Sequence, residues 1–288
     1  MEQFKHLLTV LLLSYVTVSW SQQETLITQF TEHMNIINPA YVGVDGETLL
    51  TSTIRSQWTG IVDAPEAQIV SFGTSLGKNV GLGLSMLRER TFIERQTFVG
   101  MDFSYKVKIS ESTDLYLGLK AGGNFYEVNE NGLNTYNVIS DPSLIDINRF
   151  TPNVGAGLYL KKENWYISFS LPRLLNAEKA SMDNGVVASY LDRPHLYVAS
   201  GYDLALNGNG TLFLQPSFLF RSVTGAPVSL DINTMVSFNN VFKIGATYRT
   251  SKAYAGIASF ELGKHMIIGF AYEMSAREQL AVAKNTNE

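Results

Sequence analysis

The stretch that decides the fold is Leu115-Tyr116-Leu117-Gly118-Leu119-Lys120-Ala121-Gly122. Leucine or alanine occupies every second position, and Tyr, Gly, Lys and Gly lie between them. A period of two is that of a β-strand with one apolar and one polar face. The same alternation runs through residues 80–86, 228–238 and 242–248. The sequence therefore predicts an all-β fold.

The polar face of these strands indicates which kind of β fold forms. It carries charged and amide side chains in mid-strand: Asp102, Lys106, Lys120, Asp231, Asn233, Lys243 and Arg249. The segments are about as long as the ~9–11 residues that cross a bilayer at a tilt, whereas strands of soluble sheets most often have ~5–6. A closed barrel also leaves no unpaired edge in lipid. We therefore expect a transmembrane antiparallel β-barrel, apolar outside and polar inside.

The strand count leaves one question open. About thirteen strands can be placed between residues 47 and 275, whereas bacterial single-chain barrels have even numbers, so about 14 are expected. Residues 276–288 form a polar tail without alternation. Either the count is off by one or the last strand is missing. Short and long connections alternate along the chain, and the two longest, 127–151 and 172–194, are expected on the extracellular rim, where recognition loops lie.

Composition narrows the function. The 288 residues have 17% charged side chains, a net charge of −4 and no cysteine. The charge argues against nucleic-acid binding, and the lack of cysteine excludes disulfides and thiolate sites. Residues 1–21 read as a signal peptide, with Lys5, an apolar core over 7–18 and small residues at 19 and 21; a membrane anchor is the alternative. Later apolar runs are too short for a membrane helix.

The domain organisation predicted from these patterns has four parts. The signal peptide (1–21) is followed by an N-terminal periplasmic segment (22–46), an outer-membrane β-barrel (47–275) and the polar tail (276–288). Within the second part, residues 24–37 either hang in the periplasm or fold up into the lumen. The two long loops, 127–151 and 172–194, are the first two candidates for a functional site, and this segment is the third.

Catalytic patterns are weak. His33, His195 and His265 have no ligand spacing. His195 with Ser200 on one strand suggests a hydrolase, but no nucleophile elbow or orienting acid accompanies them. Asp63 and Glu66 fit a solvated hairpin tip better than an acid–base pair. We expect no enzyme activity, cofactor or metal.

A second informative stretch runs from Asn38 to Gln68. In Asn38-Pro39-Ala40-Tyr41-Val42-Gly43, Pro39 extends the backbone of Asn38 and Gly43 permits a positive φ. The rest reads as a hairpin with Arg55 and Trp58 near its tip. We expect Arg55 to pair with Glu66 across the hairpin and Trp58 to join an interfacial aromatic belt.

This stretch also carries a resemblance to a known family. The glutamine-rich start at 22–24 and the motifs NPAYVG (38–43), RSQW (55–58), a glycine at 60 and APEAQ (64–68) resemble PorP/SprF outer-membrane proteins of Bacteroidetes. The resemblance continues through Leu82–Ser85, Gly118–Gly122, Asp141-Pro142, Pro152–Tyr159 and Leu171–Leu175. The residues that carry it at the opening are Asn38, Pro39, Ala40, Tyr41, Gly43, Arg55, Gln57, Trp58, Gly60, Pro65, Glu66 and Gln68.

The resemblance implies a function. Such barrels work with the type IX secretion and gliding machinery, and some support export or retention of a secreted surface adhesin. Expected partners are outer-membrane lipid, a client protein, for instance its C-terminal domain, and type IX components. The alternatives are an outer-membrane diffusion or uptake channel, for which Lys120, Asp231 and Arg249 would line the pore, and a soluble secreted β-sandwich.

Overall fold

The computed structural model describes residues 26–128, 147–178, 191–262, 266–275 and 285–288. The signal peptide, His265 and most of the two longest loops lie outside these residues. Short helical turns come first: η1 (Phe30–His33), α2 (Met34–Ile37), η2 (Pro39–Tyr41) and η3 (Val44–Gly46). None of the helices in the described part of the chain is long and apolar enough to cross a membrane.

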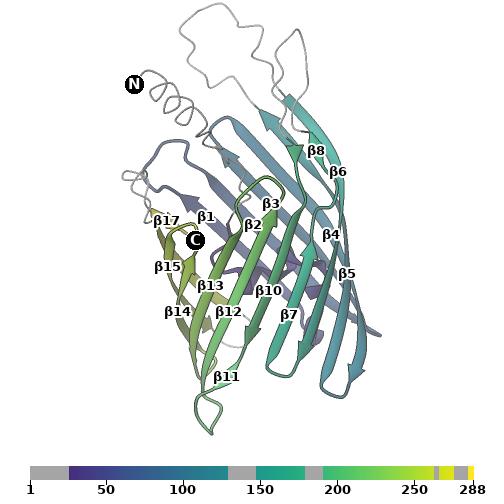
Figure 1. Ribbon diagram of the computed structural model, residues 1–288, viewed down its shortest axis with the longest axis vertical. Helices are drawn as coiled ribbons and strands as arrows, with labels where there is room; N and C mark the ends of the chain where they lie inside the picture. Colours follow the sequence, from purple (N-terminus) through teal and green to yellow (C-terminus); the bar gives the residue numbers. More distant parts are fainter. Residues whose placement is uncertain (1–25, 129–146, 179–190, 263–265, 276–284) are drawn as a thin grey trace, which may run out of the picture.

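Strands make up most of the rest of the described chain (Figure 1). They are β1 (Leu49–Gln57), β2 (Glu66–Gly77), β3 (Val80–Thr91), β4 (Glu94–Ser110), β5 (Thr113–Val128), β6 (Ile147–Lys162), β7 (Trp165–Leu171), β8 (Ala177–Glu178), β9 (Leu191–Asp192), β10 (His195–Tyr202), β11 (Leu204–Ala205), β12 (Leu212–Val223), β13 (Ser229–Phe238), β14 (Phe242–Arg249), β15 (Ala253–Leu262), β16 (Met266–Ser275) and β17 (Asn285–Asn287).

The strands close into an antiparallel barrel. Each long strand pairs with its neighbours in sequence, β10 pairs with β12, and β17 joins β16 to β1. Without the two-residue β11 beside β12 and the separate β8–β9 hairpin, fourteen strands of the described chain form the ring. The expected barrel is confirmed. The open question about its closure is answered by β17, which lies inside the region expected to be a polar tail without alternation.

β17 closes only part of the seam. Thr286 and Asn287 pair with Gln57 and Ser56 of β1, and Glu288 exchanges backbone hydrogen bonds with Ala271 of β16. Residues 49–55 of β1 have no other strand of the described chain on that edge. Three residues are too few to show a period of two, so the sequence pattern could not reveal this strand.

The alternation in the sequence separates the two faces of the wall. Leu117 and Leu119 on β5 are 41% and 62% exposed, whereas Tyr116 and Lys120 are each 3% exposed and point inward. Outward-facing Leu, Ile, Val, Phe and Met side chains recur on the other strands. A barrel with an apolar outer surface and a polar interior suits a bilayer.

The connections differ between the two rims. Two-residue turns such as Lys78-Asn79 and Asn239-Asn240 have positive φ at both positions, as type I′ hairpins require. The ends of β5 and β6 that flank the longest connection, where Val128 pairs with Ile147, lie at the opposite rim (Figure 1). This alternation agrees with the predicted division into short and long connections.

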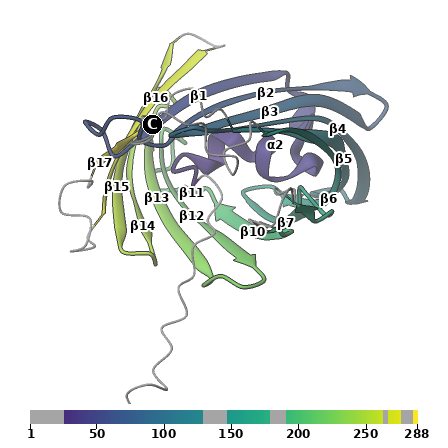
Figure 2. The ribbon, with the colours of Figure 1, turned by 90° about the horizontal axis from the view of Figure 1, so that it is seen from above.

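The N-terminal segment lies inside the barrel. Figure 2 shows α2 and the turns around it enclosed by the wall, close to β3–β6. Phe30, Met34 and Ile37 are buried there in one cluster with side chains of the wall. Residues 24–37 were expected either to hang in the periplasm or to fold up into the lumen. The described residues of this segment, 26–37, lie in the lumen. Residues 26–46 are called the plug below.

Candidate functional site in the barrel lumen

The plug passes from the level of Arg55, near one end of β1, to the opposite rim. Thr28 contacts Arg55, Asn35 and Ile36 lie over Lys120 in the middle of β5, and Asp45 pairs with Lys161 near the short turns. The chain then turns into β1. The plug therefore lies along much of the lumen and is fixed to the wall at several heights.

Asn38 is the residue that ties the plug to the wall. Its side-chain oxygen accepts a hydrogen bond from the Ala40 backbone N–H at 2.8 Å, which caps the turn that Pro39 begins. Its Nδ2 donates to the Leu158 carbonyl at 2.9 Å and to the Ser168 hydroxyl at 2.8 Å. Asn38 is completely buried. One amide thus shapes the turn and bridges β6 and β7.

Glycines of the wall receive this turn. A Cβ at Gly118 would overlap the backbone nitrogen of Ala40, one at Gly157 would overlap the Asn38 side chain, and one at Gly81 would overlap the Val42 carbonyl. The Val42 carbonyl also accepts a hydrogen bond from the Ser104 hydroxyl. Gly43 has φ +73° and itself packs against Gly81. The NPAYVG turn therefore packs directly against the glycines of the wall, and side chains at these glycine positions would exclude it.

Replacing Asn38 by alanine tests this contact. The change removes a buried cap and leaves the Leu158 carbonyl and Ala40 N–H with fewer partners, so we expect the barrel to lose about 1–3 kcal/mol of unfolding free energy. The measurement is urea unfolding in detergent. Asn148→Ala, on the exposed outer wall, is the matched control. Equal stability of both variants would contradict the assigned role of Asn38.

Arg55 does not pair with Glu66, so that prediction was wrong. Arg55 faces Ala67 across the hairpin and points into the lumen, whereas Glu66 lies opposite Ser56 on the outer face. Because successive strand residues point to opposite faces, a one-residue offset separates the two side chains. Glu66 instead pairs with Arg90 at 3.8 Å.

The actual partners of Arg55 lie across the seam. Its guanidinium donates to Glu273 of β16 at 3.1 Å, and to Glu288 and the Thr28 hydroxyl at 3.0 and 2.9 Å. Arg55 and Glu288 are both buried. Glu288 also accepts from the backbone N–H groups of Thr28 and Gln29. These hydrogen bonds join three parts of the chain at one point: strand β1, Glu288 after β17, and the start of the plug.

The ion pairs continue along the wall. Arg249 forms two hydrogen bonds to Asp231, at 2.9 and 3.0 Å, and a third to Glu273 at 2.8 Å. Arg221 donates to the same Asp231 at 2.7 Å. The alternating charges cross β12, β13, β14, β16 and β1 and end at Glu288. This set is called the charge ladder: Arg221, Asp231, Arg249, Glu273, Arg55 and Glu288.

The alternation in the sequence predicts only part of the charge ladder. Asp231 and Arg249 were expected to face the lumen, but Arg221, Glu273 and Glu288 were not singled out. Glu273 could have been found, because it shares the inward face of β16 with Ala271, which is 1% exposed. A second buried pair, Lys120 and Asp102 at 3.1 Å, lies on the opposite side beneath α2.

The other residues of the opening motif lie outside the lumenal contact. Trp58 is half-buried at the end of β1 with φ +55°, and Gly60 has φ +98° in the loop that follows. Pro65 accepts from the Gln57 N–H at 2.9 Å, and Gln68 donates to Glu66 at 3.4 Å. These residues shape the β1–β2 hairpin and do not contact the NPAYVG turn.

The possible catalytic residues do not assemble. His195 hydrogen-bonds the Arg193 carbonyl at 2.9 Å, and the Ser200 hydroxyl donates to the Tyr166 carbonyl. An odd offset along the strand puts the two side chains on opposite faces of β10. Asp63 lies in the β1–β2 loop. Within the described residues, no group of three or more His, Asp or Glu side chains is arranged to hold a metal.

His33 lies in the plug and gives it a pH dependence. Burial lowers its pKa below 6.5, although the carboxylates of Glu288 and Glu32 act in the other direction. Nε2 lies 2.6 Å from the Thr53 hydroxyl, and Nδ1 has no partner in the described structure. The unfolded chain therefore binds the proton more readily than the folded one.

We expect the plug to be fully stable above pH 6.5 and to loosen as the pH falls below that value. Hydrogen exchange of residues 27–37, followed on both sides of this pH, measures the effect. His33→Gln, which cannot titrate, should remove the difference once exchange rates are corrected for pH. The same acceleration in both proteins would contradict the assignment.

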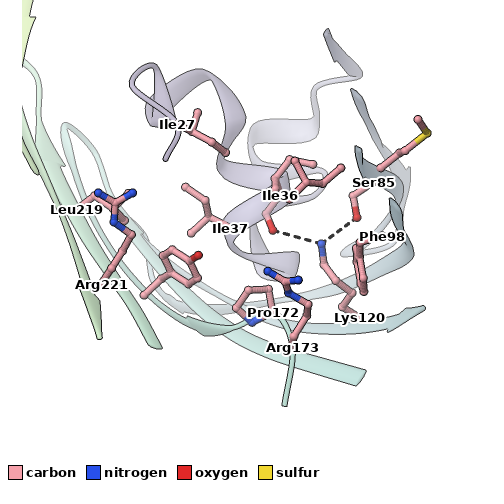
Figure 3. Close-up of a pocket in the computed structure, with 13 residues that line it drawn as sticks. Ile27, Ile36, Ile37, Ser85, Phe98, Lys120, Pro172, Arg173, Leu219 and Arg221 are labelled. Atoms are coloured by element: carbon pink, nitrogen blue, oxygen red, sulfur yellow. Dashed lines mark hydrogen bonds between the residues drawn. The ribbon is translucent and has the colours of Figure 1, made fainter. Parts of the chain in front are cut away.

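Two of the cavities in the described part of the chain adjoin the plug. One lies between Ile36, Ile37, Arg221 and Arg173 (Figure 3) and has a volume of about 40 Å³. Lys120 lies beside it and donates to the Ser85 hydroxyl at 2.8 Å. This cavity is large enough only for a few water molecules. A second, of about 260 Å³, lies between the plug and the part of the wall from β6 to β15 and reaches Asn164, Trp165 and Asp203 at the rim of the short turns. The plug thus occupies one side of the lumen more fully than the other.

Comparison with known proteins identifies the family. A family model described as "Type IX secretion system membrane protein PorP/SprF" matches residues 19–288. The chain belongs to the PorP/SprF family. This membership and the barrel point to the outer membrane. In this PorP/SprF protein the matched segment includes the plug motif, the glycine-rich strands that receive it and the charge ladder.

Other comparisons add little. No curated protein matches the chain. Mutant porins of Rhodopseudomonas blastica are similar in structure at 8% and 9% sequence identity, with TM-scores of 0.34 and 0.33. In both cases the match covers 84% of this chain and 97% of the porin.

Proposed function

We propose that this PorP/SprF protein is a non-enzymatic docking component of type IX secretion. It would support the export or surface retention of a secreted protein such as an adhesin. Residues 1–21 would direct export and be removed. The rim of the long connections would face the cell exterior and hold the client, for instance by its C-terminal domain, while the rim of the short turns would face the type IX machinery.

The observation that carries this proposal is the plug. A diffusion channel needs a water-filled passage, whereas here a segment of the same chain is held in the lumen by a buried capping residue and by hydrogen bonds to the buried side chains of Arg55 and Glu288. Because the plug is fixed to the wall at several levels along the barrel axis, it stiffens the barrel. A rigid barrel is a suitable scaffold for binding partners at its rims. The family description supports the link to secretion.

The connection between β7 and β10 offers the sharpest test. Residues 174 and 175 are tied to the wall because their backbone N–H groups donate to Asn153 at 3.0 and 3.1 Å. A deletion should therefore spare them. Replacing Ala177–Asp192 by a short Gly-Ser linker is expected to abolish retention of the client at the cell surface while the barrel stays folded.

The control for this deletion is at the other rim. Shortening the turn Asn207–Gly210 should leave client retention unchanged if the client binds only at the rim of the long connections. Surface labelling of secreted proteins measures both variants, and heat-modifiable gel mobility reports folding. Normal retention with the first deletion would overturn this version of docking.

The cavity of about 260 Å³ beside the plug favours the second candidate, a diffusion or uptake channel. Its acidic, basic and amide lining would suit small polar solutes. Planar-bilayer recordings separate the two functions, because the docking component should give no stable conductance steps. Regular steps from the unmodified protein would favour the channel.

A further inference from the structure

The outer wall of β2–β5 changes character abruptly along its height. In one row of neighbouring residues Phe72, Leu84 and Met101 point outward, and in the next row towards the long connections Val70, Met86 and Val99 do so. Leu84 and Met101 are 52% and 69% exposed. Such rows suit the acyl chains of a bilayer.

Charged residues begin in the next outward row. There Arg88 lies between Gln68 and Thr97, and in the row after it Arg90 and Arg95 lie directly opposite each other. All three arginines are exposed. Like charges directly opposite in a sheet repel. The fold thus keeps three guanidinium groups close together at the edge of the apolar surface.

The neighbouring acids do not neutralise this cluster. Glu66 reaches Arg90 only at 3.8 Å, in an exposed pair. Glu127 lies opposite Arg95, but no ion pair joins them, and none joins Arg88 to another residue of the described chain. Exposed pairs contribute little in any case. Two of the three arginines therefore remain available to an anion.

The aromatic side chains give the depth of the cluster in the membrane. Phe125 and Phe150 continue the row of Arg88 and Thr97 around the barrel, and their rings lie 4.8 Å apart. Both are exposed on the outer face. Aromatic girdles mark the level at which the acyl region meets the headgroups. The arginines therefore lie at headgroup height.

We propose that Arg88, Arg90 and Arg95 bind the phosphate of a membrane lipid in the leaflet on the side of the long connections. The acyl chains would lie along Val70, Leu84, Met86 and Val99. A guanidinium fork matches phosphate oxygens with paired hydrogen bonds. A bound phosphate would also relieve the repulsion between Arg90 and Arg95.

The experiment compares two lipids that differ only in the phosphate. Full-length protein in neutral-detergent micelles is incubated with phosphatidic acid or with diacylglycerol of the same chains, and bound lipid is counted by native mass spectrometry. We expect phosphatidic acid to bind at least about tenfold more tightly. Equal binding of the two lipids would overturn the proposal.

Variants locate the site. Arg88→Gln with Arg95→Gln should lower phosphatidic acid binding by about tenfold, because two charged donors are lost. Lys106→Gln with Lys108→Gln removes the same charge at the other end of β4 and should leave it unchanged. An unaltered Arg double variant would overturn the assignment. So would full competition by inorganic phosphate, which would make the site one for a free anion. Heat-modifiable mobility checks that each variant is folded.

Discussion

Replacing Gly118 by valine is expected to expel the NPAYVG turn from its seat and to open the lumen to ions. A Cβ at this position would overlap the Ala40 backbone, which cannot move aside like a flexible side chain. The plug and the valine cannot occupy the same space. Because the strand pairing of β5 with its neighbours needs no side chain at 118, the barrel itself should still form.

Planar-bilayer conductance measures this effect, and limited proteolysis of residues 26–46 gives a second readout. Gly256→Val is the matched control, because this glycine of β15 has open space where its Cβ would be. The Gly118 variant should show conductance steps and a cleavable plug, and the Gly256 variant neither. If the Gly118 variant stayed as closed and protease-resistant as the parent, the contact between plug and wall would not hold the lumen shut.

Replacing Arg249 by leucine is expected to have the largest effect on stability. Arg249 makes three charge-assisted hydrogen bonds, to Asp231 and Glu273, and is 2% exposed. Within the described residues, its loss leaves Arg55 as the one cation paired with Glu273 and Arg221 as the one cation paired with Asp231. Removing one partner from a buried ion network costs about 3–5 kcal/mol.

The measurement is the urea dependence of unfolding in neutral detergent. Arg90→Leu is the control, because its pair with Glu66 is exposed and 3.8 Å long, so the change should stay within about 1 kcal/mol. Similar losses in the two variants would mean that the ladder stabilises the barrel no more than a surface pair does.

Much of the wall could be predicted from the sequence, because its physical cause is local. The period of two in residues such as Leu117–Lys120 depends only on which face points outward and which points into the lumen, and the structure has those faces as expected. The turns at Lys78-Asn79 and Asn239-Asn240 are equally local. The lumenal placement of Lys120, Asp231 and Arg249 followed from the same alternation.

The site depends on contacts that no local pattern encodes. Gly118 and Gly157 looked like ordinary strand glycines, although their role is to admit Ala40 and Asn38 from a distant segment. The pairing of Arg55 with Glu66 was expected because the two residues are neighbours along a hairpin. The register is offset by one residue, so Arg55 points into the lumen and Glu66 points outward. Glu288 meets Arg55 only once the barrel has closed.

The most direct measurement for the docking function is affinity purification of the tagged protein from its native outer membrane, with mass spectrometry of what accompanies it. The protein with Ala177–Asp192 replaced is purified in parallel. We predict that a large secreted protein and type IX components accompany the intact chain, and that the secreted protein is lost from the variant. Recovery of the barrel without either, from membranes that contain both, would contradict this prediction.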